Sequence, residues 1–385
     1  MKKILSLFAI ALMGVSLFTA CSDDDNNSTD SSVQTDFSNG IFIVNSGNQS
    51  KNIDGTLTFI DNNTGNTLQK CFQTVNGRSL GLTVEDAVTY GDKMYIVVTQ
   101  ENTVEVVDSK TLKSIKQLKT TDLMGAEKGS KPRNIVAYKG KVYVSTYATA
   151  TTSQEDGSVK GCVAAIDTTD FSTTTYEVGA YPEGMAVNNG KLYVANSSYG
   201  NGKAPSISEI DLASGTVNEI KDPLITNPVS ITAVNGVLYI LDSGLYDASW
   251  NQSGQGVRTY SNGKFAKLAD ATAMAVNADA TKIYLINNPY TNPATAITYS
   301  VYDTKTGKTS RFIDGSNVYS PTGISVDPKT GHIYIISYNE DPDTKKAAYS
   351  LPGYVNEYDS NGSFIKKYDT GVGPNAIKFT SENAK

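Results

Sequence analysis

Residues 182–196 read PEGMAVNNGKLYVAN, and this segment is the most informative one for the fold. Two short apolar runs, Met185–Val187 and Leu192–Val194, flank the turn at Asn189–Gly190. Short runs rich in apolar and β-branched residues on both sides of an Asn-Gly pair are typical of an antiparallel β-hairpin. The stretch therefore predicts two paired strands, with Tyr193 in the middle of the second one.

The same phrase returns five more times along the chain. Each copy joins a short apolar run, usually opened by Pro, to a strand built around Tyr. The central tyrosines are 45 to 50 residues apart: Tyr95, Tyr143, Tyr193, Tyr239, Tyr284 and Tyr334. Two further alternating segments lie between copies, for example Cys162–Asp167 and Thr173–Val178. Four short strands per unit of this length indicate β-propeller blades, whereas a β-helix repeats at about half that length or less. We interpret the regular tyrosines as blade packing, without a functional role.

The two ends of the chain supply one more blade between them. Three strands are expected near the start, at Gly40–Asn45, Thr56–Asp61 and Asn66–Phe72, and the missing innermost strand is found at Pro374–Phe379. We therefore predict an all-β, seven-bladed propeller with four-stranded blades over residues 40–385, whose ring is closed by a C-terminal strand joining the N-terminal blade. Closure removes the open sheet edges that would otherwise template aggregation.

The first 39 residues have the composition of an export signal followed by a tether. Lys2 and Lys3 precede a mostly apolar run, so residues 1–20 are expected to be a secretory signal peptide. Cys21 follows in the position of the lipid-bearing Cys of a bacterial lipobox, and the alternative is an ordinary signal that leaves Cys21 free. Residues 22–25, Ser-Asp-Asp-Asp, resemble the acidic tract that sends lipoproteins of Bacteroidetes-type bacteria to the cell surface; the alternative is a solvated spacer. Residues 21–39 are thus expected to be a lipidated, flexible tether.

Composition narrows the range of functions. The 385 residues carry 33 Lys+Arg and 39 Asp+Glu, a net charge of -6, without a basic run, so nucleic acid is not an expected partner. A mean hydropathy of -0.28 excludes a polytopic membrane protein. The one His, His332, opens a Tyr strand and is expected to be a strand residue rather than a base. Cys71 and Cys162 fall two blades apart, which disfavours a disulfide and predicts two inert thiols.

Signatures of catalysis are missing from the sequence. It has no nucleophile elbow, no phosphate-binding loop and no His/Cys cluster with metal-ligand spacing, so we expect no enzyme, no metal and no cofactor. The alternative is a carboxylate cluster of Glu85, Asp86 and Glu183 at the channel mouth, which would need an acid–base partner to act as an enzyme.

Two sets of loops are expected to meet at one mouth of the central channel. The loops that open the innermost strands place seven residues of diverse charge one past the Pro position: Glu85, Arg133, Glu183, Ser230, Thr272, Thr322 and Asn375. The loops that leave the Tyr strands are long and combine aromatic residues with Gly, Ser and Asn, as ligand-binding loops do. The alternative is that each loop Tyr packs only its own loop. The predicted ligand-binding residues are Glu85, Arg133, Tyr147, Tyr181, Glu183, Tyr199, Tyr246, Trp250, Tyr290, Tyr338 and Asn375.

The Pro-x-Gly-x-x-Val…Gly-Lys-Leu-Tyr-Val-Ala-Asn pattern of residues 182–196 resembles the YVTN/NHL-like propellers. A narrower likeness combines residues 21–25, the segment Gly-Ile-Phe-Ile-Val-Asn-Ser-Gly at 40–47, and seven blades with Tyr-bearing loops that end in Gly-Pro-Asn-Ala-Ile at 373–377. Together they look like the surface propeller lipoproteins that capture cobalamin.

That resemblance implies binding of cobalamin and related corrinoids on the loop face, with Arg133 near the nucleotide-loop phosphate. It also implies delivery to a TonB-dependent outer-membrane transporter and a lipid-anchored place at the outer membrane. Two alternatives stay open: an extracellular propeller enzyme of the lactonase or lyase type, and a protein-interaction platform for glycan uptake.

Overall fold

The computed structural model describes residues 35–148, 159–200 and 202–382. The expected signal peptide at 1–20, Cys21, the acidic tract and most of the tether lie outside the described residues, as does much of the loop after Tyr147. Asp36–Lys385 form one compact unit. Among the described residues, no helix is both long and apolar enough to cross a membrane.

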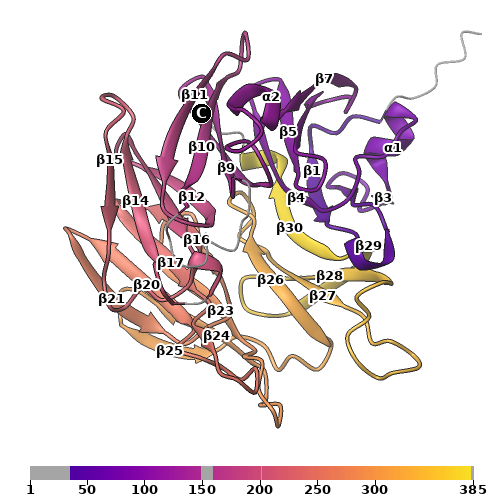
Figure 1. Ribbon diagram of the computed structural model, residues 1–385. Coiled ribbons are helices and arrows are strands. Elements are labelled where there is room, and N and C mark those ends of the chain that lie inside the picture. The colour runs from indigo at the N-terminus through magenta and orange to yellow at the C-terminus, as the bar shows by residue number, and fades with distance from the viewer. Residues whose placement is uncertain (1–34, 149–158, 201, 383–385) are drawn as a thin grey trace, which may run out of the picture. The chain divides into compact units, whose positions relative to one another are not determined.

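The described residues form seven four-stranded antiparallel sheets, which are the blades of a propeller (Figure 1). From the innermost strand outward, blade one consists of β30 (Pro374–Phe379), β1 (Gly40–Asn45), β2 (Thr56–Asp61) and β3 (Thr67–Leu68), and blade two of β4 (Val84–Tyr90), β5 (Lys93–Val98), β6 (Thr103–Asp108) and β7 (Ser114–Lys119). Blade three consists of β8 (Pro132–Tyr138), β9 (Lys141–Thr146), β10 (Gly161–Asp167) and β11 (Thr173–Val178). Blade four consists of β12 (Pro182–Asn188), β13 (Lys191–Asn196), β14 (Ser206–Asp211) and β15 (Val217–Ile220).

Blades five to seven follow the same order. Blade five consists of β16 (Pro228–Val234), β17 (Val237–Asp242), β20 (Gly256–Ser261) and β21 (Lys264–Ala269). Blade six consists of β22 (Ala273–Val276), β23 (Lys282–Asn287), β24 (Thr298–Asp303) and β25 (Lys308–Arg311). Blade seven consists of β26 (Ser320–Val326), β27 (Ile333–Tyr338), β28 (Pro352–Tyr358) and β29 (Phe364–Val372). A two-stranded hairpin, β18 (Leu245–Tyr246) and β19 (Gln252–Ser253), stands in the loop between β17 and β20. The predicted seven-bladed all-β propeller is confirmed.

Ring closure joins the two ends of the chain in blade one. The C-terminal β30 pairs antiparallel with β1, with Ile41 opposite Phe379 and Ile43 opposite Ile377. Figure 1 shows this pairing as a yellow strand beside the indigo start of the chain. The backbone N–H of Gly40 donates to Thr380 Oγ1 at 2.9 Å, and both strands share a buried cluster with β27 and β28 of blade seven. The predicted closure is therefore confirmed.

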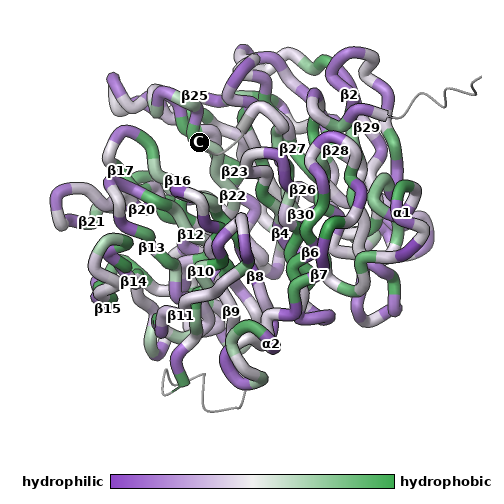
Figure 2. The backbone as a smooth tube through the Cα atoms, turned by 90° about the horizontal axis from the view of Figure 1, so that it is seen from above, coloured by the Kyte–Doolittle hydropathy of each residue, from purple (hydrophilic) through white to green (hydrophobic). Residues whose placement is uncertain are grey.

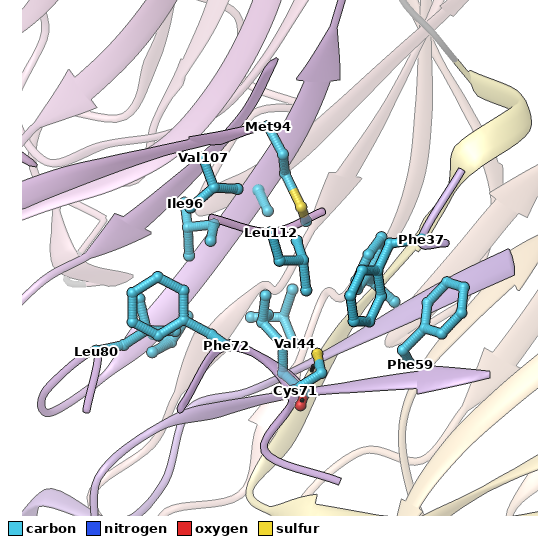
Figure 3. Close-up of a cluster of buried hydrophobic side chains, with 14 of the residues drawn as sticks. Phe37, Val44, Phe59, Cys71, Phe72, Leu80, Met94, Ile96, Val107 and Leu112 are labelled. Atoms are coloured by element: carbon cyan, nitrogen blue, oxygen red, sulfur yellow. Dashed lines mark hydrogen bonds between the residues drawn. The ribbon is translucent and has the colours of Figure 1, made fainter. Parts of the chain in front are cut away.

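Apolar side chains fill the spaces between neighbouring blades. The cluster between blades one and two contains Phe37, Phe59, Phe72, Met94 and Leu112, all buried (Figure 3). In Figure 2 the hydrophobic colour runs along strands such as β6 and β10, and the hydrophilic colour gathers at turns. The six repeat tyrosines are all buried in the blades, as the sequence predicts.

The outer edge of blade one differs from the prediction. The expected strand Asn66–Phe72 is reduced to β3, and the chain then forms helix α1 (Cys71–Asn76). Cys71 and Phe72 are buried on this helix, and the Cys71 Sγ donates to the carbonyl of Leu57 at 3.3 Å. Tertiary burial of these two side chains overrides their strand-like pattern. A second short helix, α2 (Thr120–Met124), follows blade two. Cys71 and Cys162 are both buried and unpaired.

Candidate functional site

The start of each innermost strand presents side chains to the central channel. Pairing between the innermost and second strands shifts register at Glu85 in β4, at Arg133 in β8 and at Glu183 in β12. Such β-bulges re-aim side chains and are common beside active sites. The three residues line a cavity of about 550 Å³, together with Ser230 and Asn375. Five of the seven predicted mouth positions thus line this cavity; Thr272 and Thr322 do not.

Arg133 binds two carboxylates at once. Its Nη1 lies 2.9 Å from Glu85 Oε2, and its Nε donates to Glu183 Oε2 at 3.1 Å. The Tyr147 hydroxyl donates to the other oxygen of Glu183, and the Arg133 guanidinium lies 5.0 Å from the centre of the Tyr147 ring. We call Glu85, Arg133, Glu183 and Tyr147 the channel-mouth cluster. It comes from blades two, three and four, and no local sequence motif could contain it.

Electrostatics place the titration of Glu85 near neutral pH. Burial raises the pKa of Glu85 to about 7; Arg133 opposes the rise, and the carboxylates of Glu183 and Asp86 add to it. Burial also disfavours the charge on Arg133, but Glu183 and Glu85 outweigh it and raise the pKa of Arg133, which stays charged. Burial and the Glu183 carboxylate raise the pKa of Tyr147, which stays a protonated donor. A carboxyl poised near pH 7 beside a fixed cation is suited to acid–base catalysis.

A second ion pair lines the same cavity. Lys378 Nζ is 2.6 Å from Asp86 Oδ1, and Asp86 Oδ2 accepts the backbone N–H of Ile135 at 3.0 Å. Sequence reasoning missed Lys378. The signal was present, since Lys378 is the one charged residue of the innermost strands beyond Glu85, Asp86, Arg133 and Glu183. With three acids and two bases, the charged lining of the cavity leaves no spare positive charge when Glu85 is ionised.

Three tyrosines lead from the cluster toward solvent. The Tyr147 and Tyr181 ring centres are 4.9 Å apart, edge to face, and the Tyr181 and Tyr199 ring centres are also 4.9 Å apart. Tyr147 and Tyr181 are buried, whereas Tyr199 is 65% exposed. The predicted Asn375 joins the same region, because its Nδ2 donates to the carbonyl of Glu85 at 2.8 Å. The structure therefore brings together seven predicted residues: Glu85, Arg133, Tyr147, Tyr181, Glu183, Tyr199 and Asn375.

The other predicted residues form two separate aromatic groups. Tyr246 and Trp250 lie with ring centres 6.3 Å apart, and the Tyr290 backbone is hydrogen-bonded to the same hairpin. Tyr338 packs edge to face on Tyr349 at 5.0 Å, in the long loop of blade seven. None of the four predicted residues in these groups lines the cavity that contains Glu85, Arg133 and Glu183.

Within the described part of the chain, neither a metal-binding group nor His332 provides a second candidate catalytic site. Among the described residues, no group of three or more His, Cys, Asp or Glu side chains is placed to hold a metal ion. His332 Nδ1 lies 2.7 Å from Glu357 Oε1, and the hydroxyls of Tyr334 and Tyr368 donate to the same carboxylate. His332 thus belongs to a hydrogen-bonded network of blade seven, but it lies one residue before β27 begins at Ile333 and not within the strand as predicted.

Comparisons with known proteins identify the fold more firmly than the reaction. The family described as "Domain of unknown function (DUF5074)" matches residues 39–370. A search of curated proteins finds no match.

Solved structures of similar fold carry names that imply different functions. A hypothetical selenium-binding protein from Sulfolobus tokodaii has a TM-score of 0.63 at 11% identity, over 90% of this chain and 94% of its own. The periplasmic gluconolactonase of Pseudomonas aeruginosa has a TM-score of 0.58 at 12% identity, over 88% of this chain and 99% of its own. A Bacteroides fragilis protein, named provisionally a 6-phosphogluconolactonase, has a TM-score of 0.57 at 12% identity, over 92% of this chain and 99% of its own.

These neighbours correct the prediction that the chain is not an enzyme. That prediction rested on missing sequence motifs, and it is contradicted by solved propellers that are named as lactonases. Motifs are a poor guide here, because a propeller assembles its mouth from single residues on different blades. At 11 to 12% identity the likeness is one of fold, so the reaction has to be argued from the residues at the mouth.

Proposed function

This chain belongs to the DUF5074 family, and from its channel mouth we propose a hydrolase that opens a lactone, a cyclic ester. One observation carries the proposal: Glu85, with a pKa of about 7, lies 2.9 Å from the cation of Arg133 in a cavity of about 550 Å³. Ester hydrolysis needs a base to deprotonate water and a positive charge to stabilise the oxyanion that forms. The names of the solved neighbours favour lactones among esters.

The chemistry follows from the pairing of Glu85 with Arg133. The ionised Glu85 takes a proton from water as the water oxygen attacks the lactone carbonyl. Protonation of Glu85 weakens its hold on Arg133, so the guanidinium charge becomes available to the tetrahedral oxyanion at that moment. The protonated Glu85 then donates to the departing ring oxygen, which gives the hydroxy acid and restores the carboxylate. Glu183, held by Tyr147, keeps Arg133 in position throughout.

The test is Glu85→Gln, which keeps the shape and removes the base. We expect kcat/KM for sugar and alkyl lactones to fall by about 10²- to 10⁴-fold, the usual contribution of a general base. The wild type should gain activity with rising pH through an inflection near pH 7. Glu177→Gln, on the exposed outer strand of blade three, is the matched control and should leave the rate unchanged. Failure of the wild type to open any lactone, or full activity in Glu85→Gln, would refute the proposal.

A second candidate function is capture of cobalamin for a TonB-dependent transporter, as the sequence resemblance implies. Its support is Tyr199, which is 65% exposed at the outer end of the aromatic series that begins at Arg133. A corrinoid phosphate would have to compete with two carboxylates for Arg133. Calorimetry with cyanocobalamin tests this candidate, and Tyr199→Ala should weaken binding by roughly 2 kcal/mol if Tyr199 is an anchor. The absence of measurable heat with the wild type would exclude it.

A further inference from the structure

A second surface, apart from the channel, carries exposed aromatic side chains on a hairpin and a neighbouring loop. It consists of Leu245, Tyr246 and Trp250 from the β18–β19 hairpin of blade five, and Tyr290 from the next blade. Trp250 is 70% exposed, Tyr290 65% and Tyr246 44%. We call these four residues the aromatic platform. Exposed patches of large apolar side chains mark interaction or ligand-binding sites.

Hydrogen bonds between two blades hold the platform in place. The Gln252 N–H donates to the Tyr290 carbonyl at 2.7 Å, and the Tyr290 N–H donates to Gln252 Oε1 at 3.0 Å. The Asn292 N–H donates to Asn251 Oδ1 at 2.7 Å. These bonds join the hairpin of blade five to the loop that follows β23 in blade six. The rings are therefore presented by a fixed frame, which reduces the entropy lost when a ligand binds.

Trp250 occupies its position at an energetic cost. Its φ is 65°, a left-handed conformation that bulky side chains rarely adopt, and its indole is mostly in water. The turn is fixed by Asp247, whose carbonyl accepts the Trp250 N–H at 2.9 Å and whose Oδ1 accepts the N–H groups of Ser249 and Asn251. Strained backbone at an exposed aromatic residue points to function, since stability alone would favour another residue there.

Charge indicates what the platform binds. Residues 245–253 and 287–297 contain one charged side chain, Asp247, and that carboxylate accepts hydrogen bonds from its own turn. The remaining polar groups are amides and hydroxyls of Asn, Gln, Ser and Thr. A phosphate or carboxylate ligand would find no cation on these segments. A neutral molecule with apolar faces and many hydroxyls matches both the rings and the amides.

We infer that the aromatic platform binds a neutral saccharide, with the C–H face of a sugar ring stacked on Trp250. Tyr246 and Tyr290 extend the contact to neighbouring sugar units, and the loop amides bond the hydroxyls. The inference does not depend on the proposed hydrolase, because it uses no residue of the channel-mouth cluster.

Trp250 is the only Trp in the chain, so its fluorescence reports this surface alone. Neutral oligosaccharides of glucose, xylose, mannose and galactose are titrated against the purified protein. We expect at least one to shift the emission with a dissociation constant in the micromolar to millimolar range. Calorimetry should show that Trp250→Ala and Tyr290→Ala each weaken binding at least about tenfold. Ile115→Ala, an exposed apolar residue on outer strand β7, should bind as the wild type does, and melting temperatures check the fold.

Three outcomes would overturn the inference. The first is that none of these saccharides changes the emission or gives heat at millimolar concentration. The second is that binding persists in both aromatic variants, which would place the sugar elsewhere. The third is that cyanocobalamin or a protein partner, and no saccharide, depends on Trp250. Loss of lactone hydrolysis would leave the inference intact, so the two proposals fail separately.

Discussion

Arg133 is a residue whose role follows from its neighbours more than from its own charge. A single guanidinium serves Glu85 at 2.9 Å and Glu183 at 3.1 Å, so neither carboxylate has a full positive charge to itself. Burial is the main cause of the raised pKa of Glu85, and the like charge of Glu183 at the same site adds to it. The sequence showed Glu85, Arg133 and Glu183 as candidates by their equal place after the Pro position. It could not show that they contact one another, because that depends on blade geometry.

Tyr147→Phe tests this sharing at the level of one hydroxyl. The change removes the hydroxyl that donates to Glu183. The Glu183 carboxylate then attracts Arg133 more strongly, and the ionised form of Glu85 is stabilised less. We expect the inflection of the pH–rate profile to move above pH 7 and kcat/KM to fall by roughly tenfold. A rate loss with an unmoved inflection would show that Tyr147 supports only the fold.

The raised pKa of Glu85 also predicts how stability depends on pH. An unfolded Glu titrates near 4.5 and the folded Glu85 near 7, so the folded state holds the extra proton between these values. The stabilisation that the protonated Glu85 gives the folded state is therefore present below about pH 4.5 and is lost as the pH rises through about 7. The melting temperature of Glu85→Gln minus that of the wild type should be larger at pH 8 than at pH 5. A difference that stays constant across this window would contradict the raised pKa.

At the scale of elements, alternation and turn residues predicted the strands well. β1, β2 and β11 begin and end where the sequence placed them. The prediction for the outer edge of blade one was wrong, since the expected strand shrinks to the two residues of β3 and its end, Cys71 and Phe72, lies in α1. An outer strand has one neighbour and little burial, so its pattern is weak and a nearby apolar pocket can redirect it. Lys378 was missed for a related reason: its partner Asp86 sits on β4, nearly 300 residues earlier in the chain.

Removal of β30 tests the closure of the ring. Deletion of residues 373–385 leaves β1 with an unpaired inner edge and takes Ile377 and Phe379 out of a shared core. Each blade packs only on its neighbours, so we expect loss of cooperative unfolding and aggregation at moderate temperature. Truncation after Glu382, beyond the last described helix, is the control and should melt with the intact chain. A 373–385 deletion that melts within a few degrees of the wild type would argue against the closed ring.

For the molecule as a whole, the sequence predicts an anchor as well as a fold. We propose that Cys21 carries lipid and that the acidic tract at 22–25 sends the protein to the cell surface. Cys21→Ala should release soluble protein, and replacing Asp23, Asp24 and Asp25 with Ala should keep the lipid but lose exposure at the surface. Protease shaving of intact cells separates the two: a triple variant cleaved as fast as the wild type would reduce the tract to a spacer.

The closing strand also sets an order of events during synthesis. β1 is the first strand of the ring to be made, and its partner β30 is the last. Ile41 and Ile43 therefore stay uncovered on the side of the innermost strand until β30 has been made. Domains usually begin to fold from the N-terminus as they emerge, but this ring cannot close until β30 has been translated. A chain interrupted before β30 would keep an open sheet edge at β1, which proteases can recognise. Only a chain that contains β30 therefore escapes this recognition.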